Sequence, residues 1–192
     1  MNAAICLEVE DGYEVITVDI DGSPGFVGAV LYAKYQTLSK VKKLIKLGDL
    51  LELHENLKPV DNLGHYILKE GNTVKEIKKQ EGVCISKQRD IRQIEGDTIK
   101  KAGNFSSRFY KCKSPKMVWL NEGIDYVYVF NPELEQWSTY AQNTRATVKE
   151  IKVDYHLYIK NLIYRDDLSE LTREEREKLE YVKRRCNECK AR

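Results

Sequence analysis

The N-terminal part of the chain places two β-rich runs, a short glycine-bearing turn and an amphipathic run in immediate succession. The runs "ICLEVE" and "YEVITVDI" are separated by Asp11-Gly12, a pair that tolerates the positive φ angles of a type I′ hairpin turn. After "DGSPG", apolar residues recur at helical spacing, with Ser23 placed to cap a helix and Pro24 suited to its first position. This order predicts a hairpin that leads through a tight corner into a helix.

A second helix is predicted directly afterwards, in "SKVKKLIKLGD". Ser39 is placed to cap it, and Gly48 supplies its C-terminal stop. Its apolar positions form one buried stripe, and its lysines face outward. Further along, residues 83–91 have strand-like composition, and residues 97–116 are rich in Gly, Ser, Asn and Lys, which predicts a long loop.

The second half of the chain predicts a β-meander followed by helices. "MVWL", "IDYVYVF" and "WSTYA" are expected as strands separated by turns at residues 121–123 and 131–136. From Thr147 onward the apolar spacing becomes helical, and Thr172 opens a further, highly charged helix. We therefore expect an α+β fold with an antiparallel sheet, a core domain over residues 1–167 and a charged helical appendage over residues 168–192.

Charge is unevenly distributed along the 192 residues, although the formal net charge is only +2. Residues 1–37 hold six acidic residues and one lysine, whereas residues 69–116 hold thirteen Lys and Arg against six Asp and Glu, a local net of +7. A basic segment of this kind suits an anionic partner such as a nucleotide, a nucleic acid or an acidic protein face. A solvated lysine-rich surface explains the same composition.

The sequence has no run of eighteen apolar residues and no basic segment followed by an apolar stretch at its N-terminus, so we expect a soluble, intracellular protein. Five scattered cysteines do not resemble a secreted disulfide framework. Cys186 and Cys189 form a C-x-x-C pair, which supplies half of a zinc site. An exposed tail is the alternative for that pair, and no cofactor is expected.

The segment "VDIDG" permits three interpretations. With Asp19 as nucleophile and Asp21 as proton shuttle around magnesium, it resembles the haloacid dehalogenase phosphatases. Alternatively, the glycines let backbone amides at the helix start approach a phosphate. In the purely geometric interpretation, Asp21-Gly22 forms the turn while Gly28 permits close packing of the helix on the sheet.

Aromatic and basic residues alternate around residues 108–113, as stacking on a base and pairing with its phosphate require. Tyr126, Tyr128 and Trp137 are expected to be partly core, because aromatic residues dominate core burial. The predicted ligand-binding residues are Lys87, Arg89, Arg108, Tyr110, Lys111, Lys113 and Trp119.

The stretch "DGSPGFVGAVLYAKYQTLSKVKKLIKLGDLLEL" resembles the opening module of a family of small bacteriophage proteins, mostly without assigned function. Their pattern runs roughly W-D-G-Y-P, V-G, L, H-Y, K-V, L-I, L-G-D and L, and a weaker match extends to "YVYVFNPELEQW". Ile20, Ser23 and Lys34 stand where the family usually has Trp, Tyr and His. The motif positions that carry the resemblance and the geometry are Asp21, Gly22, Pro24, Gly28, Gly48 and Asp49.

The resemblance implies a phage gene product that acts in the host cytoplasm, where proteins of this size often inhibit host defence. Together with the basic segment, it favours a non-catalytic counter-defence protein that sequesters an anionic, nucleotide-type signal such as a cyclic oligonucleotide or an ADP-ribose derivative. One alternative is an inhibitor that blocks a host protein through the C-terminal helix. The other is a metal-dependent phosphoesterase that uses Asp19 and Asp21. A homo-oligomer is compatible with each.

Overall fold

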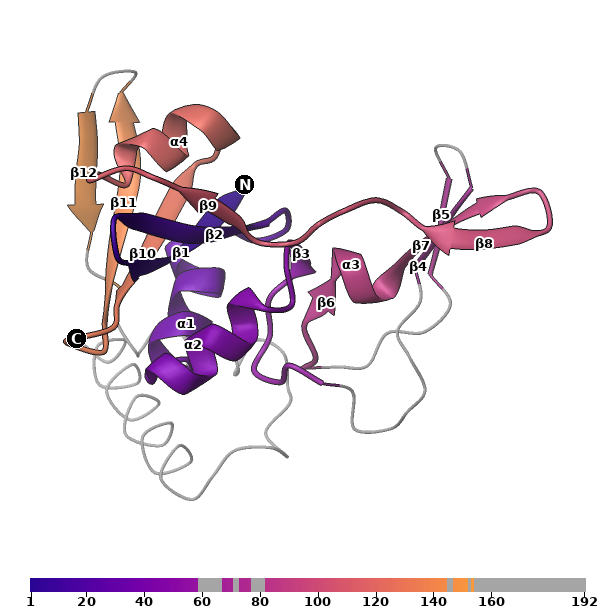
Figure 1. Cartoon of the computed structure of the whole chain (residues 1–192), viewed down its shortest axis with the longest axis horizontal. Helices are drawn as coiled ribbons and strands as arrows, with labels where there is room; N and C mark the ends of the chain where they lie inside the picture. The colour runs from indigo at the N-terminus through magenta and orange to yellow at the C-terminus, as the bar shows by residue number, and fades with distance from the viewer. Residues whose placement is uncertain (59–66, 71–72, 77–81, 145–146, 152, 154–192) are drawn as a thin grey trace, which may run out of the picture.

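The computed structural model describes residues 1–58, 67–70, 73–76, 82–144, 147–151 and 153. Two sheets and a few short helices make up this part of the chain (Figure 1). The α+β class predicted from the sequence is confirmed at this level. The predicted C-terminal helices beyond residue 153, the boundary at residues 167 and 168, and the pair Cys186 and Cys189 lie outside the described residues.

The N-terminal strands pair with each other. β1 (Ala3–Val9) and β2 (Gly12–Val18) are antiparallel, with Val9 opposite Gly12, so the connection is Glu10-Asp11. Only Asp11 of this turn has a positive φ, 66°, and the expected type I′ turn at Asp11-Gly12 is wrong. Gly12 is required for another reason, because a Cβ there would clash with the backbone of Tyr110 in a neighbouring strand.

The larger sheet is mixed rather than antiparallel. Its order is β12 (Thr147–Ile151), β11 (Gln136–Thr144), β10 (Tyr126–Asn131), β1, β2, β3 (Leu50–Glu52) and β6 (Ile85–Ser86), with β9 (Arg108–Tyr110) also paired to β2. β1 is parallel to β10 and β2 is parallel to β3, whereas the other pairs are antiparallel. The expectation of a purely antiparallel sheet is wrong because two helices between β2 and β3 return the chain to the same end of the sheet.

The helices cover both faces of this sheet (Figure 1). The π-helical turn η1 (Pro24–Gly28), α1 (Ala29–Lys34) and α2 (Leu38–Ile45) pack against one face, together with Ile5, Ile16 and Tyr128. α4 (Lys116–Glu122) lies on the other face, where Trp119 and Val118 join the alternate residues of β1 and β2. Because β10 is covered on both sides, Val127 to Phe130 are all buried, and the expectation of a half-buried strand is wrong.

Several local predictions also need correction. Ser23 occupies the N-cap position of η1, but its side chain makes no capping hydrogen bond, and the N-cap of α2 is Thr37 rather than Ser39. Residues 83–91 contain the short β6 and then α3 (Lys87–Asp90), and residues 97–116 include β8 (Thr98–Lys101) and β9. The run "MVWL" belongs to helix α4, and the segment from Thr147 begins as strand β12.

A smaller sheet projects from this body in the order β5 (Thr73–Glu76), β4 (Ile67–Glu70), β7 (Ile91–Glu95) and β8. β4 and β7 are parallel, and β7 and β8 form a hairpin whose loop is Gly96-Asp97. All four residues of β8 are exposed. We call β7 and β8 together the β7–β8 hairpin. It carries part of the basic segment away from the main core.

Candidate functional site

The corner after β2 is held by packing and by backbone hydrogen bonds. The Tyr128 hydroxyl donates to the carbonyl oxygen of Gly22 at 2.8 Å, and the amide of Gly22 donates to the carbonyl oxygen of Met1 at 3.0 Å. A Cβ on Gly22 would lie 2.8 Å from atoms of Ala3 and Asn2, and one on Gly28 would lie 3.0 Å from the Tyr128 ring. These contacts support the geometric interpretation, since Gly28 allows close packing of the helix on the sheet.

Three backbone amides at the start of this helix donate hydrogen bonds within the fold. Phe26 and Gly28 donate to the carbonyl oxygen of Ser23, at 3.1 and 3.3 Å, and Val27 donates to that of Asp21 at 3.3 Å. These donors are therefore not directed at a ligand. The interpretation of this corner as a phosphate cradle is not supported by its geometry.

Asp19, the nucleophile of the phosphoesterase alternative, is ion-paired. Its Oδ2 lies 2.6 Å from Nζ of Lys87, which also lies 5.7 Å from the centroid of the Phe105 ring. Among the described residues, no group of three or more His, Cys, Asp and Glu side chains is arranged to hold a metal ion. The geometry thus gives Lys87 and Asp19 a structural role toward each other.

Arg108 and Tyr110, both predicted to bind ligand, belong to an ion-pair network. Nη1 of Arg108 lies 2.7 Å from Oδ2 of Asp49, and its Nε lies 2.9 Å from Oε1 of Glu122, to which Tyr110 also donates. Asp49 is buried and accepts from the Thr17 amide at 2.8 Å. Burial lowers the pKa of Arg108, but Asp49 and Glu122 outweigh it and hold that pKa above its ordinary value.

The same network disfavours ionisation of the Tyr110 hydroxyl. Burial, and then the hydrogen bond and charge of Glu122, raise its pKa. The network joins β9 and α4 to the turn that holds Asp49, beside Gly48, whose φ is 71°. Arg108 and Tyr110 therefore contribute to the stability of the fold, and their role as ligand contacts stays a prediction.

Arg89 is likewise held within the fold. Its guanidinium makes two bonds to the buried Asp90 carboxylate, at 2.7 and 2.8 Å. It also donates to the carbonyl oxygens of Leu57 and Cys84, both at 2.6 Å. Asp90 in turn accepts from the Ser86 amide at 2.8 Å. This arrangement fixes the α3 turn and neutralises the charge of Arg89.

The remaining predicted contacts divide by exposure. Trp119, a residue of α4, is only 5% exposed and packs in the core between this helix and the sheet. Its assignment as a stacking platform is therefore wrong. Lys111 and Lys113, which follow β9, are exposed. The exposed aromatic side chain of this strand is Phe109, and Glu14 stands opposite it in the β2–β9 pair. The predicted loop site therefore does not form one ligand-facing surface.

Cys84 and His54 lie together beneath β3. The Cys84 thiol donates to the carbonyl oxygen of His54 at 3.2 Å, and Nε2 of His54 lies 3.0 Å from Oε2 of Glu52. Burial raises the pKa of the Cys84 thiol. A protonated, buried thiol is a poor nucleophile, so this cluster has the character of a packed core.

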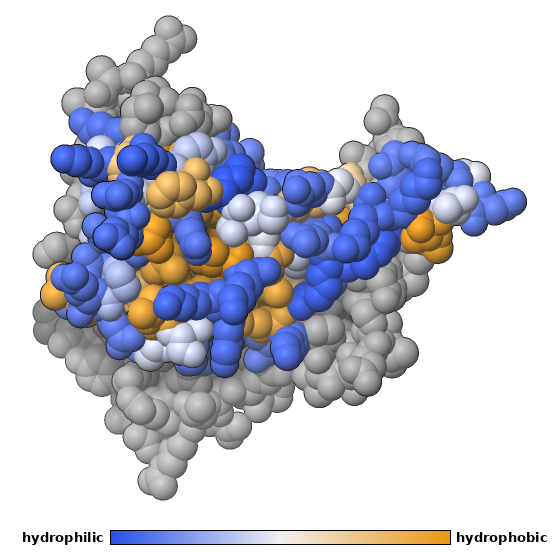
Figure 2. Space-filling view, viewed as in Figure 1, coloured by the Kyte–Doolittle hydropathy of each residue, from blue (hydrophilic) through white to orange (hydrophobic). Residues whose placement is uncertain are grey.

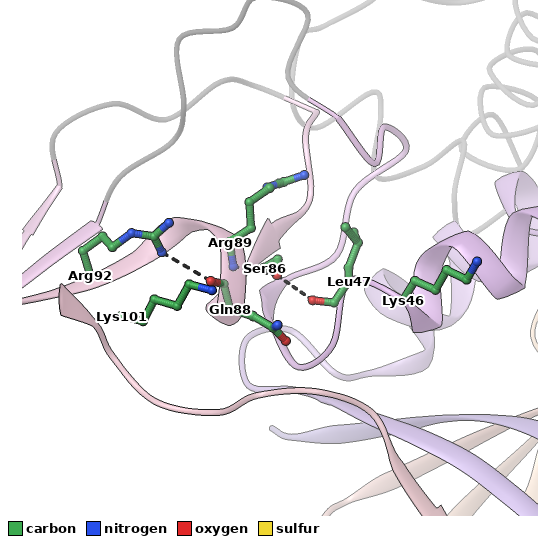
Figure 3. Close-up of a pocket in the computed structure, with 7 residues that line it drawn as sticks. All are labelled: Lys46, Leu47, Ser86, Gln88, Arg89, Arg92 and Lys101. Atoms are coloured by element: carbon green, nitrogen blue, oxygen red, sulfur yellow. Dashed lines mark hydrogen bonds between the residues drawn. The ribbon is translucent and has the colours of Figure 1, made fainter.

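An open pocket of about 280 Å³ lies where α2 ends, beside α3 and the base of the β7–β8 hairpin (Figure 3). Its lining side chains include four cations and no carboxylate among the described residues, and they are Lys46, Leu47, Ser86, Gln88, Arg89, Arg92 and Lys101. Because Asp90 neutralises Arg89, that residue adds little to the charge of the pocket. The geometry favours an anion here.

Arg92 and Lys101 stand directly opposite each other in the antiparallel β7–β8 pairing, so both side chains lie on the same face of the sheet. Figure 3 shows the two head groups turned toward Gln88, whose carbonyl oxygen accepts from Nη1 of Arg92 at 3.3 Å. Like charges directly opposite each other destabilise a β-sheet. An anion between them would relieve this repulsion.

Lys46 lines the other side of the pocket, at the end of α2. Neither Lys46 nor Lys101 has an ion-pair partner in the part of the chain that the structure describes. Ser86 lies between, but its hydroxyl donates to the Leu47 carbonyl oxygen at 2.6 Å and is already engaged. The Gln88 side chain supplies uncharged polar groups next to the cations.

Of the predicted ligand-binding residues, only Arg89 lines this pocket. Sequence reasoning missed Lys46, Gln88, Arg92 and Lys101. Arg92 and Lys101 fall within the basic segment, so that segment was the one available signal. Their juxtaposition depends on the register of a hairpin that the sequence did not predict.

No family model, curated protein or solved structure matches this chain. Within the described residues, no helix is both long enough and apolar enough to cross a membrane.

Proposed function

We propose that the protein is a non-catalytic binding protein that captures an anionic, nucleotide-type ligand in the basic pocket beside α3. The observation that carries this proposal is the opposed pair Arg92 and Lys101, both lining an open pocket to which no carboxylate of the described residues contributes. Opposed cations cost stability in the free protein. A bound phosphate group would remove the repulsion between the two cations, and this gain would add to the affinity.

The surroundings of the pair fit a nucleotide better than inorganic phosphate. Gln88 offers both donors and an acceptor to the edge of a base, and Leu47 adds apolar surface. Capture without conversion agrees with the state of Asp19, which is ion-paired to Lys87. The resemblance of the N-terminal module to phage proteins supports a counter-defence role in the host cytoplasm, in which the ligand would be a nucleotide signal.

The test incubates the protein with AMP, ADP-ribose, cyclic dinucleotides and inorganic phosphate, removes the unbound ligand, denatures the protein and identifies what is released. We expect an intact nucleotide to be released. Lys101→Gln and Arg92→Gln should each weaken its binding by at least tenfold. Lys116→Gln is the matched control, because Lys116 is an exposed lysine at the start of α4, which packs on the opposite face of the main sheet from α2.

Release of a chemically altered nucleotide would replace this proposal with an enzyme. Retention of full affinity in the Lys101→Gln variant would show that the ligand binds elsewhere. Absence of any uptake across the panel, measured together with the strand experiment below, would overturn the proposal.

A further inference from the structure

The pocket is continuous with a wider basic surface on α2. Lys42, Lys43 and Lys46 are exposed on the solvent side of this helix, opposite the buried Val41, Leu44 and Ile45. The sequence of α2, Leu38–Ile45, contains no acidic residue. We call Lys42, Lys43 and Lys46 together with Arg92 and Lys101 the cationic strip.

Figure 2 shows hydrophilic side chains that continue from the main body onto the projecting sheet. The strip ends on the β7–β8 hairpin before its tip, because Glu95 pairs with Lys100 at 2.9 Å and Asp97 lies in the loop. Lys100 projects from the opposite face of β8 to Lys101. The cationic strip therefore lies on one face of the molecule and ends before the tip of the β7–β8 hairpin.

The strip repels itself at two independent places. Lys42 and Lys46 are four residues apart on one helix, where like charges destabilise it by about 0.2–0.5 kcal/mol. Arg92 and Lys101 are opposed in the hairpin. The C-terminal position of the lysines offsets part of the first cost through the helix dipole. Both repulsions are relieved by one ligand with several negative charges.

The open shape of the pocket indicates what kind of polyanion the protein binds. Small-molecule sites enclose most of their ligand and are lined mainly by apolar side chains, whereas this pocket is open to solvent and has four cations among its seven lining residues. A chain of phosphates can pass across such a surface while one nucleotide enters the hollow beside Gln88. A paired duplex cannot insert a base there without flipping it out.

We propose, building on the function proposed above, that the ligand is a single strand of nucleic acid. Its phosphates would follow the cationic strip from α2 to the β7–β8 hairpin, and one of its nucleotides would occupy the pocket. The nucleotide site and the lysines of α2 would then act together, and the affinity would depend strongly on salt concentration.

The experiment measures binding of the full chain to fluorescein-labelled dT20 by anisotropy between 50 and 300 mM salt, with AMP and an unlabelled 20-base-pair duplex as competitors. Each lost phosphate contact lowers the slope of log K against log salt by about 0.7 for a single strand. The double variant Lys42→Gln/Lys46→Gln should therefore reduce the slope by about 1.4. The control Lys116→Gln should leave it unchanged.

The outcomes separate the two proposals. If AMP binds and Lys101→Gln weakens it, but the α2 double variant leaves dT20 affinity and slope unchanged, the strand proposal is overturned and the nucleotide site stands. If the duplex competes as well as unlabelled dT20, the single-strand assignment is overturned. If neither AMP nor dT20 binds and the panel above also shows no uptake, both proposals fail.

Discussion

The corner between β2 and η1 differs from the β7–β8 hairpin in how closely other atoms pack around its glycines. At the corner, the space beside Gly22 and Gly28 is filled by neighbouring atoms within 2.8 and 3.0 Å of where a Cβ would stand. In the hairpin, nothing lies within 4 Å of a Cβ built on Gly96, and every residue of β8 is exposed. The corner is constrained by packing, whereas the hairpin is held by strand pairing, within itself and between β7 and β4.

This difference separates the conspicuous motif from the candidate site. "VDIDGSPG" resembles an active-site turn in sequence, but the amide of Gly22, the space beside Gly22 and the carboxylate of Asp19 have structural partners. The hairpin has no recognisable motif, and yet it places two cations opposite each other at a pocket. Side chains that stabilise the fold are unavailable to a ligand. The comparison therefore predicts large stability effects in the body and large binding effects at the hairpin.

The largest stability effect should come from Trp119. Trp119→Ala removes a buried side chain that α4 packs against the sheet. Large-to-small changes of this type cost about 3–5 kcal/mol. Phe109→Ala is the matched control, because Phe109 is 55% exposed on β9 and should change the free energy of unfolding by less than about 0.5 kcal/mol. Urea denaturation followed by circular dichroism measures both. Equal losses would contradict the assignment of Trp119 to the core.

A somewhat smaller loss is expected from Asp49→Ala. The change leaves the Arg108 guanidinium without its 2.7 Å partner and the Thr17 amide without its acceptor. Because Arg108 keeps part of its solvent contact and its bond to Glu122, we expect a loss of about 3 kcal/mol, the low end for a broken buried pair. Asp49→Asn keeps an acceptor for Thr17 and should lose less. If the two variants are equally stable, the charge of Asp49 has no structural role.

The sequence predicted the elements whose signals are local. Pro24 and the apolar spacing after it place the start of a helix correctly, and the alternating aromatic residues identify β10. Burial of Tyr128, and partial burial of Tyr126 and Trp137, agree with their predicted place in the core. These predictions succeed because each depends on residues within a few positions of one another.

The failures involve contacts between distant segments. Val148 and Ile151 fit a helical spacing over a short window, and they form a strand because β11 pairs with them. Residues 117–120 fit a strand by composition, but the chain forms α4, which Gly123 ends with a φ of 61°. The pocket was missed for the same reason, because Lys46 reaches it from a helix about fifty residues away in the sequence.

Tyr128→Phe tests the hydrogen bond that closes the corner. It leaves the carbonyl oxygen of Gly22 without its 2.8 Å donor, which should cost about 1–2 kcal/mol at neutral pH. Burial also raises the pKa of Tyr128 above its ordinary value. The folded state therefore keeps this proton when the unfolded chain, with a pKa of about 10, has lost it.

Because the pKa of Tyr128 is higher in the folded state than in the unfolded chain, the stability of the fold depends on pH. Stability from this group is complete below about pH 10 and falls as the pH rises further, by about 1.4 kcal/mol per pH unit. Tyr128→Phe should remove that part of the alkaline slope, measured by urea denaturation between pH 9 and 11. A variant whose slope matches that of the original protein would show that Tyr128 ionises freely in the fold.

The smallest expected effect has the opposite sign and lies in the hairpin. Lys101→Gln removes one of two opposed cations on β7 and β8, so the free protein should gain about 0.2–1 kcal/mol of stability, the range for cross-strand pairs. Lys100→Gln is the control, since Lys100 pairs with Glu95 at 2.9 Å and should show no gain. Thermal unfolding at low salt reveals the difference, and added salt should reduce it because it screens exposed charges. If Lys101→Gln is destabilising, the opposed cations do not repel each other, and the tension that an anion would relieve is absent from the pocket.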